Sequence, residues 1–199
     1  LQCISSAMKS MCEGELVQVL ERDNLNLLRQ RYLVIVKKKT ASLFAASCRA
    51  GSILVSDNRA RHNALKDYGL NFGIAFQIVD DYLDLTGEQE RLGKIPGQDL
   101  SVGEITLPIL NLLDCVDKNE RENLIRLFKS KPKDYLGNIK NRFLNSRAML
   151  PTKRTALSYL NTAKKKLNIL PYSDYRKSLF DLADFISRKS FSDNLKEEN

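Results

Sequence analysis

Several residue types that carry common kinds of chemistry are scarce in this sequence. Histidine occurs once in 199 residues, at His62 in a polar stretch typical of a helix start at the surface, so an imidazole base is not expected. The four cysteines, which we expect to be small buried residues, lack the close pairing that zinc sites and disulfide frameworks need. No apolar run reaches the length of a membrane span and no secretory signal is visible, which favours a cytoplasmic or organelle-lumen enzyme.

Acidic residues are fewer than basic ones, 24 against 32, and the formal net charge is +8. The basic residues are nevertheless dispersed, and the lysine runs at 37–39 and 164–166 contain no interleaved aromatic residues. We interpret the second run as a solvated helix face. A nucleic-acid partner is therefore not expected, whereas a polyanionic small substrate and an anionic membrane surface both agree with this charge.

Apolar side chains recur at helical spacing along almost the whole chain, and no segment shows the two-residue alternation of a strand. The pattern predicts an all-α fold and, at this length, a single domain over residues 1–199. Residues 86–103, rich in glycine and proline, are predicted to form a long loop. The predicted helices cover 1–20, from 28 or 32 to 54, 60–85, 107–115, 119–130, 133–148, a stretch marked by Ala156, Leu160, Ala163 and Leu167, and a stretch marked by Leu179, Leu182, Ala183 and Ile186.

Small residues predict a close contact between helices. Ala41, Ala45 and Ala46 give the second predicted helix a surface that a neighbour can approach. Gly69 and Gly73 lower the helix propensity of the third, which makes sense where something approaches its backbone.

The third predicted helix carries three carboxylates and an amide in an otherwise apolar segment, FQIVDDYLD at 76–84. At helical spacing Gly73, Gln77, Asp80 and Asp84 form one stripe. Beside it runs an apolar row that should point into the core, formed by Phe72, Phe76, Val79 and Leu83. Buried carboxylates one turn apart repel each other unless cations compensate them, and oxygen ligands without histidine or cysteine favour Mg²⁺. The alternative, an N-cap or exposed acidic turn, agrees less well with the apolar surroundings.

Two lysines and a threonine can be added to this stripe. Thr40 shares a helix face with Val36 and Leu43, so Lys39 and Thr40 can point inward, where a lysine needs an anion. Lys94 lies in the predicted loop, close in sequence to the carboxylates. Together these residues suit a metal-bound diphosphate whose remaining oxygens the lysines neutralise. Taken alone, Lys39 fits a surface lysine equally well.

Four segments of the chain resemble, in the same order, the later motifs of trans-isoprenyl diphosphate synthases, most closely the long-chain polyprenyl type. They are GELVQ at 14–18, KTASL at 39–43, FQIVDDYLD at 76–84 and LGKIPGQDLSVGEITLP at 92–108. Residues 159–188 also resemble the final helices of that family. The resemblance implies an isoprenoid-synthase-type helical bundle lacking its N-terminal helices, and a homodimer or a heteromer with a chain that supplies the first aspartate-rich motif.

The resemblance also implies a prenyltransferase that condenses an allylic diphosphate with isopentenyl diphosphate, with Mg²⁺ as cofactor. Asp80, Asp81 and Asp84 match the second aspartate-rich motif, which binds Mg²⁺ at the diphosphate. Lys39, Thr40, Gln77 and Lys94 match positions that contact the same diphosphate or its metals. The implied catalytic residues are Lys39, Asp80, Asp81 and Lys94.

Two departures from the family pattern limit what the resemblance implies. The first aspartate-rich motif has no counterpart, so we expect residues 1–199 to be the C-terminal portion of one polyprenyl synthetase domain, inactive alone. The alternative is a naturally split subunit that a second polypeptide completes. Glu104 stands where many relatives place a lysine that helps to bind diphosphate, which suggests a poorly active or regulatory homologue.

Three functions from different classes follow from these observations. The first is an active prenyltransferase of which this chain is the diphosphate-binding half. The second is a non-catalytic partner that stabilises an active synthase. The third is a terpene cyclase of related fold, although the loop motif at 92–108 is not expected in such an enzyme.

Overall fold

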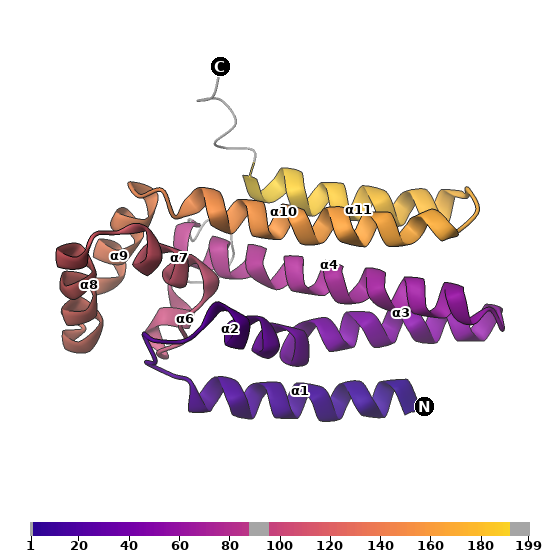
Figure 1. The fold of residues 1–199 in the computed structure, drawn as a ribbon, viewed down its shortest axis with the longest axis horizontal. Coiled ribbons are helices and arrows are strands. Elements are labelled where there is room, and N and C mark those ends of the chain that lie inside the picture. Colours follow the sequence, from indigo (N-terminus) through magenta and orange to yellow (C-terminus); the bar gives the residue numbers. More distant parts are fainter. Residues whose placement is uncertain (1, 88–95, 192–199) are drawn as a thin grey trace, which may run out of the picture.

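A computed structural model describes residues 2–87 and 96–191, and every regular element in that part of the chain is helical (Figure 1). The all-α expectation is confirmed. The elements are α1 (Gln2–Leu20), α2 (Arg29–Val36), the π-helical segment η1 (Lys37–Ala41), α3 (Ser42–Val55), α4 (Arg59–Thr86), α6 (Gln98–Ser101), α7 (Leu107–Cys115), α8 (Lys118–Ser130), α9 (Tyr135–Leu144), α10 (Met149–Lys166), the 3₁₀ turn η2 (Leu167–Ile169) and α11 (Asp174–Phe191).

The long helices lie side by side, and α4 occupies the middle of the bundle (Figure 1). It packs against α3 on one side and α10 on the other, while α1 packs against the segment from α2 to α3. The short helices α6 to α9 gather at one end of the bundle (Figure 1). This arrangement brings the C-terminal end of α4 next to the loop that precedes α7.

Close packing of α4 on α3 depends on two glycines. A Cβ atom at Gly69 would lie 2.4 Å from the Phe44 carbonyl oxygen, and one at Gly73 would lie 2.7 Å from the Ala41 Cα atom. Both distances are far below van der Waals contact. The neighbour that the two glycines predict is therefore the small-residue surface of η1 and α3.

The C-terminal helices follow the predicted apolar pattern closely. Ala156, Leu160, Ala163 and Leu167 are all fully buried, as expected. In the lysine run at 164–166, interpreted as a solvated face, Lys165 is exposed and its two neighbours are half-buried in ion pairs with other helices. Lys164 forms an ion pair with Asp184 of α11 (2.8 Å), and Lys166 forms one with Asp67 of α4 (3.0 Å).

Several boundary predictions need correction. The helix predicted from 28 or 32 to 54 contains the π-helical segment η1, and the helix predicted over 133–148 ends at Leu144. The loop predicted over 86–103 contains α6, because its residues 98–101 form a helical turn after Gly97, which adopts a left-handed φ of 81°.

Some expected buried side chains are exposed. Phe76, predicted to point into the core, is 39% exposed, and Leu182 of α11 is 44% exposed. The cysteines, expected to be buried, include exposed Cys12 and Cys115. Cys12 lies on α1, and Cys115 is the last residue of α7.

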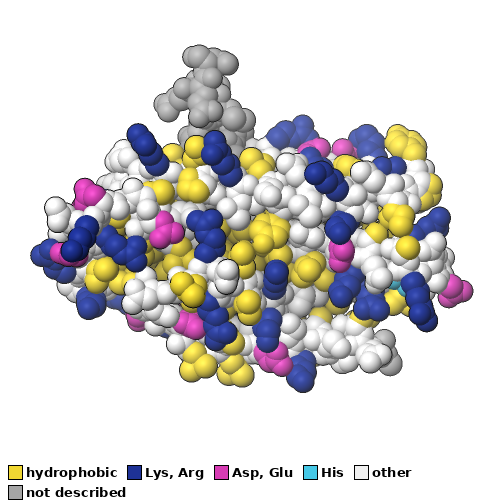
Figure 2. Space-filling view, viewed as in Figure 1, with side chains coloured by type: hydrophobic (Ala, Val, Ile, Leu, Met, Phe, Trp, Pro, Cys, Tyr) yellow, Lys and Arg dark blue, Asp and Glu magenta, His cyan; other side chains and the backbone are white. Residues whose placement is uncertain are grey.

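The surface carries both basic and apolar side chains. Lysine and arginine side chains are spread over the face in Figure 2, with apolar side chains between them. Across residues 2–87 and 96–191, no helix combines the length and the apolar character that crossing a bilayer requires.

Candidate functional site

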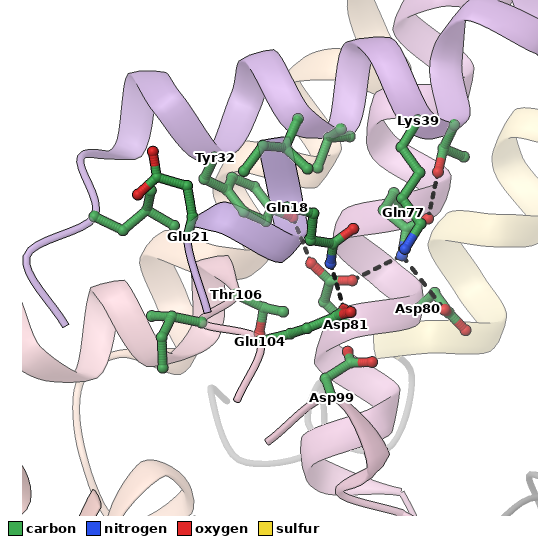
Figure 3. A pocket seen from close by; sticks show the side chains of 15 residues that line it. Gln18, Glu21, Tyr32, Lys39, Gln77, Asp80, Asp81, Asp99, Glu104 and Thr106 are labelled. Atoms are coloured by element: carbon green, nitrogen blue, oxygen red, sulfur yellow. Dashed lines mark hydrogen bonds between the residues drawn. The ribbon is translucent and has the colours of Figure 1, made fainter. Parts of the chain in front are cut away.

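A cavity of about 240 Å³ lies where α1, α2, η1 and α4 meet the loop before α7 (Figure 3). Its lining combines apolar side chains with carboxylates, one lysine and the amides of two glutamines. The lining residues are Gln18, Glu21, Leu27, Tyr32, Ile35, Val36, Lys39, Thr40, Gln77, Asp80, Asp81, Asp99, Glu104, Ile105 and Thr106.

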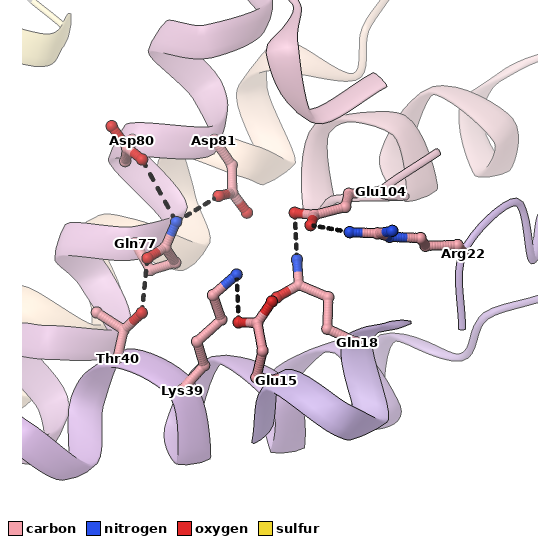
Figure 4. A network of polar contacts seen from close by, with 9 residues as sticks. All are labelled: Glu15, Gln18, Arg22, Lys39, Thr40, Gln77, Asp80, Asp81 and Glu104. Atoms are coloured by element: carbon pink, nitrogen blue, oxygen red, sulfur yellow. Dashed lines mark hydrogen bonds and ion pairs between the residues drawn. The ribbon is translucent and has the colours of Figure 1, made fainter. Parts of the chain in front are cut away.

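The π-helical segment η1 sets the orientation of Lys39 and Thr40. A π turn contains one residue more than an α turn, so it shifts the face that the following residues present. Here the Thr40 hydroxyl donates to Gln77 Oε1 (2.7 Å). The Lys39 ammonium lies 3.0 Å from Glu15 Oε2, on α1 (Figure 4).

Gln77 connects these residues to the carboxylates of α4. Its amide Nε2 donates to Asp81 Oδ1 (2.8 Å) and, at a longer 3.5 Å, to Asp80 Oδ2. With Thr40 bound to its oxygen and two carboxylates near its nitrogen, the orientation of the Gln77 amide is fixed (Figure 4).

Asp81 is the most deeply placed of the acidic residues that line the cavity, with 4% of its surface exposed. Burial, helped by the charges of Asp99 and Asp80 and opposed by hydrogen bonds from Tyr32 and Gln77, raises the pKa of its carboxyl to about 8. The Tyr32 hydroxyl donates to Asp81 Oδ2 at 2.6 Å. Burial and the nearby Asp81 charge raise the pKa of Tyr32 well above its usual value.

Asp84 is 2% exposed, and its hydrogen bonds hold residues 97–99 against α4. Its Oδ2 accepts from the backbone N–H of Asp99 (3.1 Å), and its carbonyl oxygen accepts from the N–H of Gly97 (2.8 Å). Of the predicted site residues, Lys39, Thr40, Gln77, Asp80 and Asp81 line the cavity. Asp84 does not belong to its lining, and Lys94 lies outside the described residues.

Several lining residues were not predicted as site residues. Gln18 and Asp99 lie inside the quoted motifs, which was the available signal, whereas Tyr32 had none. Glu104 was noticed only as a departure. It accepts a hydrogen bond from Gln18 Nε2 and lies 3.9 Å from Arg22 Nη2 (Figure 4). Burial raises its pKa, which Lys39 lowers and Glu15 raises.

The donor set fits a hard divalent cation. No group of three or more acidic, histidine or cysteine side chains within residues 2–87 and 96–191 is already arranged as a metal site. Asp80 and Asp99 nevertheless offer oxygen atoms alone around one cavity, which is the chemistry that Mg²⁺ prefers. Burial and the charges of Asp99 and Asp80 raise the pKa of Asp81, and a nearby cation would lower it.

Comparisons with known proteins identify the family of this chain. A family model described as "Polyprenyl synthetase" matches residues 1–141. The short chain isoprenyl diphosphate synthase of Methanothermobacter thermautotrophicus is 34% identical over 183 residues, 92% of this chain and 56% of that protein. Heptaprenyl diphosphate synthase component 2 of Bacillus subtilis is 34% identical over 190 residues, 94% of this chain and 53% of that protein.

A solved structure also matches this chain in sequence and in fold. The polyprenyl synthase from Caulobacter crescentus CB15, complexed with calcium and isoprenyl diphosphate, superposes with a TM-score of 0.90 at 35% identity, covering 95% of this chain and 58% of that one. The chain therefore spans a little over half the length of the relatives it matches.

Proposed function

Because the chain belongs to the polyprenyl synthetase family, we propose that it carries the half of a prenyl diphosphate synthase active site that binds an allylic diphosphate with Mg²⁺. The observation that carries the proposal is the convergence of Lys39, Thr40, Gln77 and Asp80 on one cavity. These side chains come from two helical segments that are far apart in sequence. They combine a cation, two hydrogen-bonding groups and a carboxylate, as a metal-bound diphosphate requires.

The reaction of the whole protein follows from its substrates. The allylic C–O bond breaks and the diphosphate leaves with the electron pair. The double bond of isopentenyl diphosphate then attacks the allylic cation, a C–C bond forms and a proton is lost to the departing diphosphate. The product is a diphosphate longer by one isoprene unit. Relatives named for short-chain, heptaprenyl and octaprenyl products support the reaction class and leave the product length open.

Each residue of the chain has a proposed role. Asp80, Asp81 and Asp84 would hold Mg²⁺. When bound, this ion supplies positive charge to the diphosphate oxygens. Lys39 and Lys94 would bind oxygens that the metal leaves free, and Gln77, fixed by Thr40 and Asp81, would orient the group.

A second candidate function is a non-catalytic partner in a heteromeric synthase. Two observations favour it: Glu104 adds a carboxylate to the cavity, and Lys39 is already paired with Glu15. One relative is named component 2 of a heptaprenyl diphosphate synthase. In either case we propose that the chain functions as a homodimer or beside a chain with the first aspartate-rich motif.

A prenyl-transfer assay tests the proposal. The chain, alone and together with a polypeptide that supplies the first aspartate-rich motif, is given an allylic diphosphate, isopentenyl diphosphate and Mg²⁺. We expect activity only in the completed enzyme, and Asp80→Ala should lower turnover at least a hundredfold because one metal ligand is lost. Asp57→Ala, which removes an exposed acid outside the cavity, is the matched control. Turnover near normal in Asp80→Ala would refute the metal role.

A further inference from the structure

The cavity carries far more negative than positive charge. Apart from the buried Asp81, whose pKa is raised, four carboxylates line it, from Glu21, Asp80, Asp99 and Glu104, whereas Lys39 is the only lysine or arginine among the described lining residues. The charge of Glu21 is compensated from outside the cavity, by Arg31 at 3.0 Å and by the Asn24 amide at 2.7 Å. An anion entering without cations would therefore meet a repulsive field.

Lys39 has already found an anion within the chain. Its ammonium lies 3.0 Å from Glu15 Oε2, and about half of the Glu15 side chain is exposed on α1. A half-exposed glutamate can rotate into solvent at small cost. Glu15 is therefore a counter-ion that an incoming phosphate can displace.

Glu104, in contrast, is held in place. The Gln18 amide donates to its carboxylate, Arg22 lies beside it, and its backbone N–H donates to the Asp99 carbonyl oxygen at 2.8 Å (Figure 4). The preceding Gly103 has a left-handed φ of 82° and accepts a backbone hydrogen bond from Asp23 at 2.7 Å. The loop is thus fastened to the end of α1, and the Glu104 carboxylate cannot swing away as Glu15 can.

We propose that Glu104 determines the ligand specificity of this cavity: its fixed charge rejects free diphosphate and admits diphosphate complexed with divalent cations. The inference rests on the proposed function, because it takes Lys39 as a diphosphate ligand. A half-buried charge that lines the same cavity as the ligand is only weakly screened. Divalent cations remove the repulsion by neutralising the diphosphate and the surrounding carboxylates together.

Calorimetric titration with inorganic pyrophosphate tests the inference without an activity assay. The purified chain, Glu104→Gln and Glu104→Lys are each titrated in buffer stripped of divalent ions and again at saturating Mg²⁺. Glu104→Gln keeps the shape of the side chain and its hydrogen bond from Gln18 while it removes the charge. Glu122→Gln, which neutralises an exposed glutamate of α8 outside the cavity, controls for net charge.

The expected result is a change in metal dependence. Without divalent ions, Glu104→Gln should bind pyrophosphate about tenfold more tightly than the parent chain, and Glu104→Lys more tightly still. At saturating Mg²⁺ the Glu104→Gln affinity should agree with that of the parent within about threefold. Glu122→Gln should match the parent in both buffers.

Other outcomes are decisive in different ways. Equal affinities of Glu104→Gln and the parent in metal-free buffer overturn the inference and leave the proposed function standing. A much weaker affinity of Glu104→Gln at saturating Mg²⁺ also overturns it, because Glu104 would then be a metal ligand. If the parent binds no pyrophosphate even with Mg²⁺, the proposed function fails and the inference fails with it. Circular dichroism establishes that each variant is folded, and Glu104→Lys provides a second variant if Glu104→Gln is unstable.

Discussion

Asp81 illustrates how a buried carboxylate can orient a neighbouring side chain. Its carboxylate accepts from Tyr32 and Gln77, the second of which also contacts Thr40. Gln77 is consequently oriented by groups on both sides. A carboxylate buried this deeply destabilises the folded state when it is ionised. Its presence indicates that the orientation of Gln77 matters more for this site than the stability that Asp81 costs.

The pH dependence of stability should report on Asp81. Burial raises its pKa from 3.8 to about 8, so the folded chain keeps this proton while the unfolded chain has lost it. The contribution of Asp81 to stability is therefore fully present below about pH 4 and is lost as the pH rises towards about pH 8. Asp81→Asn cannot ionise, and in metal-free buffer it should exceed the parent by roughly 2–5 kcal/mol in unfolding free energy at about pH 8.

Urea denaturation at several pH values measures this difference. The gain of Asp81→Asn over the parent should shrink steadily as the pH falls to about 4, because the parent carboxyl is then protonated in both states. Asp57→Asn, an exposed acid, provides the control. Parallel stability profiles for Asp81→Asn and the parent would show that Asp81 ionises normally in the fold.

At the residue scale, helical periodicity predicted the neighbours that lie on one helix and missed those that meet through packing. Gln77 and Asp80 are three residues apart, so their common face follows from the period of the helix. Tyr32 and Asp81 are separated by 49 residues and Gln18 and Glu104 by 86. Only the way the helices stack decides such pairs, and no local pattern encodes it.

At the scale of the elements, the contact between α3 and α4 fixes the site, because α3 continues η1 and α4 carries Gln77 and Asp80. Gly69→Ala should destabilise the chain by about 2–4 kcal/mol, since its Cβ would lie 2.4 Å from the rigid Phe44 carbonyl oxygen. Gly51→Ala is the matched control. A Cβ there meets nothing within 4 Å, so replacing a helical glycine should stabilise the chain by up to about 1 kcal/mol.

Thermal and urea denaturation distinguish these two substitutions by the sign of the change. A Gly69→Ala variant as stable as the parent would contradict the close approach of α3 to α4, and a destabilised Gly51→Ala would contradict the open space at Gly51. The two glycines of α4 were correctly predicted from sequence to mark an approach to the backbone. The π turn that η1 adds beside this contact was not, because a run of three lysines carries no local signal for it.

At the scale of the whole molecule, the helical bundle and its family could be predicted, and the burial of its edge helix could not. The helix predicted over 1–20 is α1, Gln2–Leu20, yet only Ala7 and Gly14 are buried in it. Gly14 lies against Lys39 and Lys38, which is why α1 can approach η1 at all. Periodicity identifies an apolar face but cannot say whether the same chain covers it.

The uncovered apolar face of α1 predicts association with a second chain. Every fourth residue along α1 is exposed and apolar or a cysteine, and the series is Ile4, Met8, Cys12, Leu16 and Leu20. Helix α1 lies at the edge of the bundle, where a second chain can reach it (Figure 1). Large exposed apolar faces associate, and burying one leucine contributes about 1.5–3 kcal/mol.

We therefore expect the chain to associate through α1, with itself or with the chain that completes its site. The double variant Leu16→Glu, Leu20→Glu should raise the dissociation constant at least tenfold in sedimentation equilibrium, because two charges would have to be buried at the contact. Leu54→Glu, an exposed leucine at the end of α3, should leave association unchanged. A parent chain that stays monomeric both alone and in the presence of its completing chain would contradict the prediction. Loss of association in Leu54→Glu as well would instead indicate non-specific aggregation, since that leucine lies outside the α1 series.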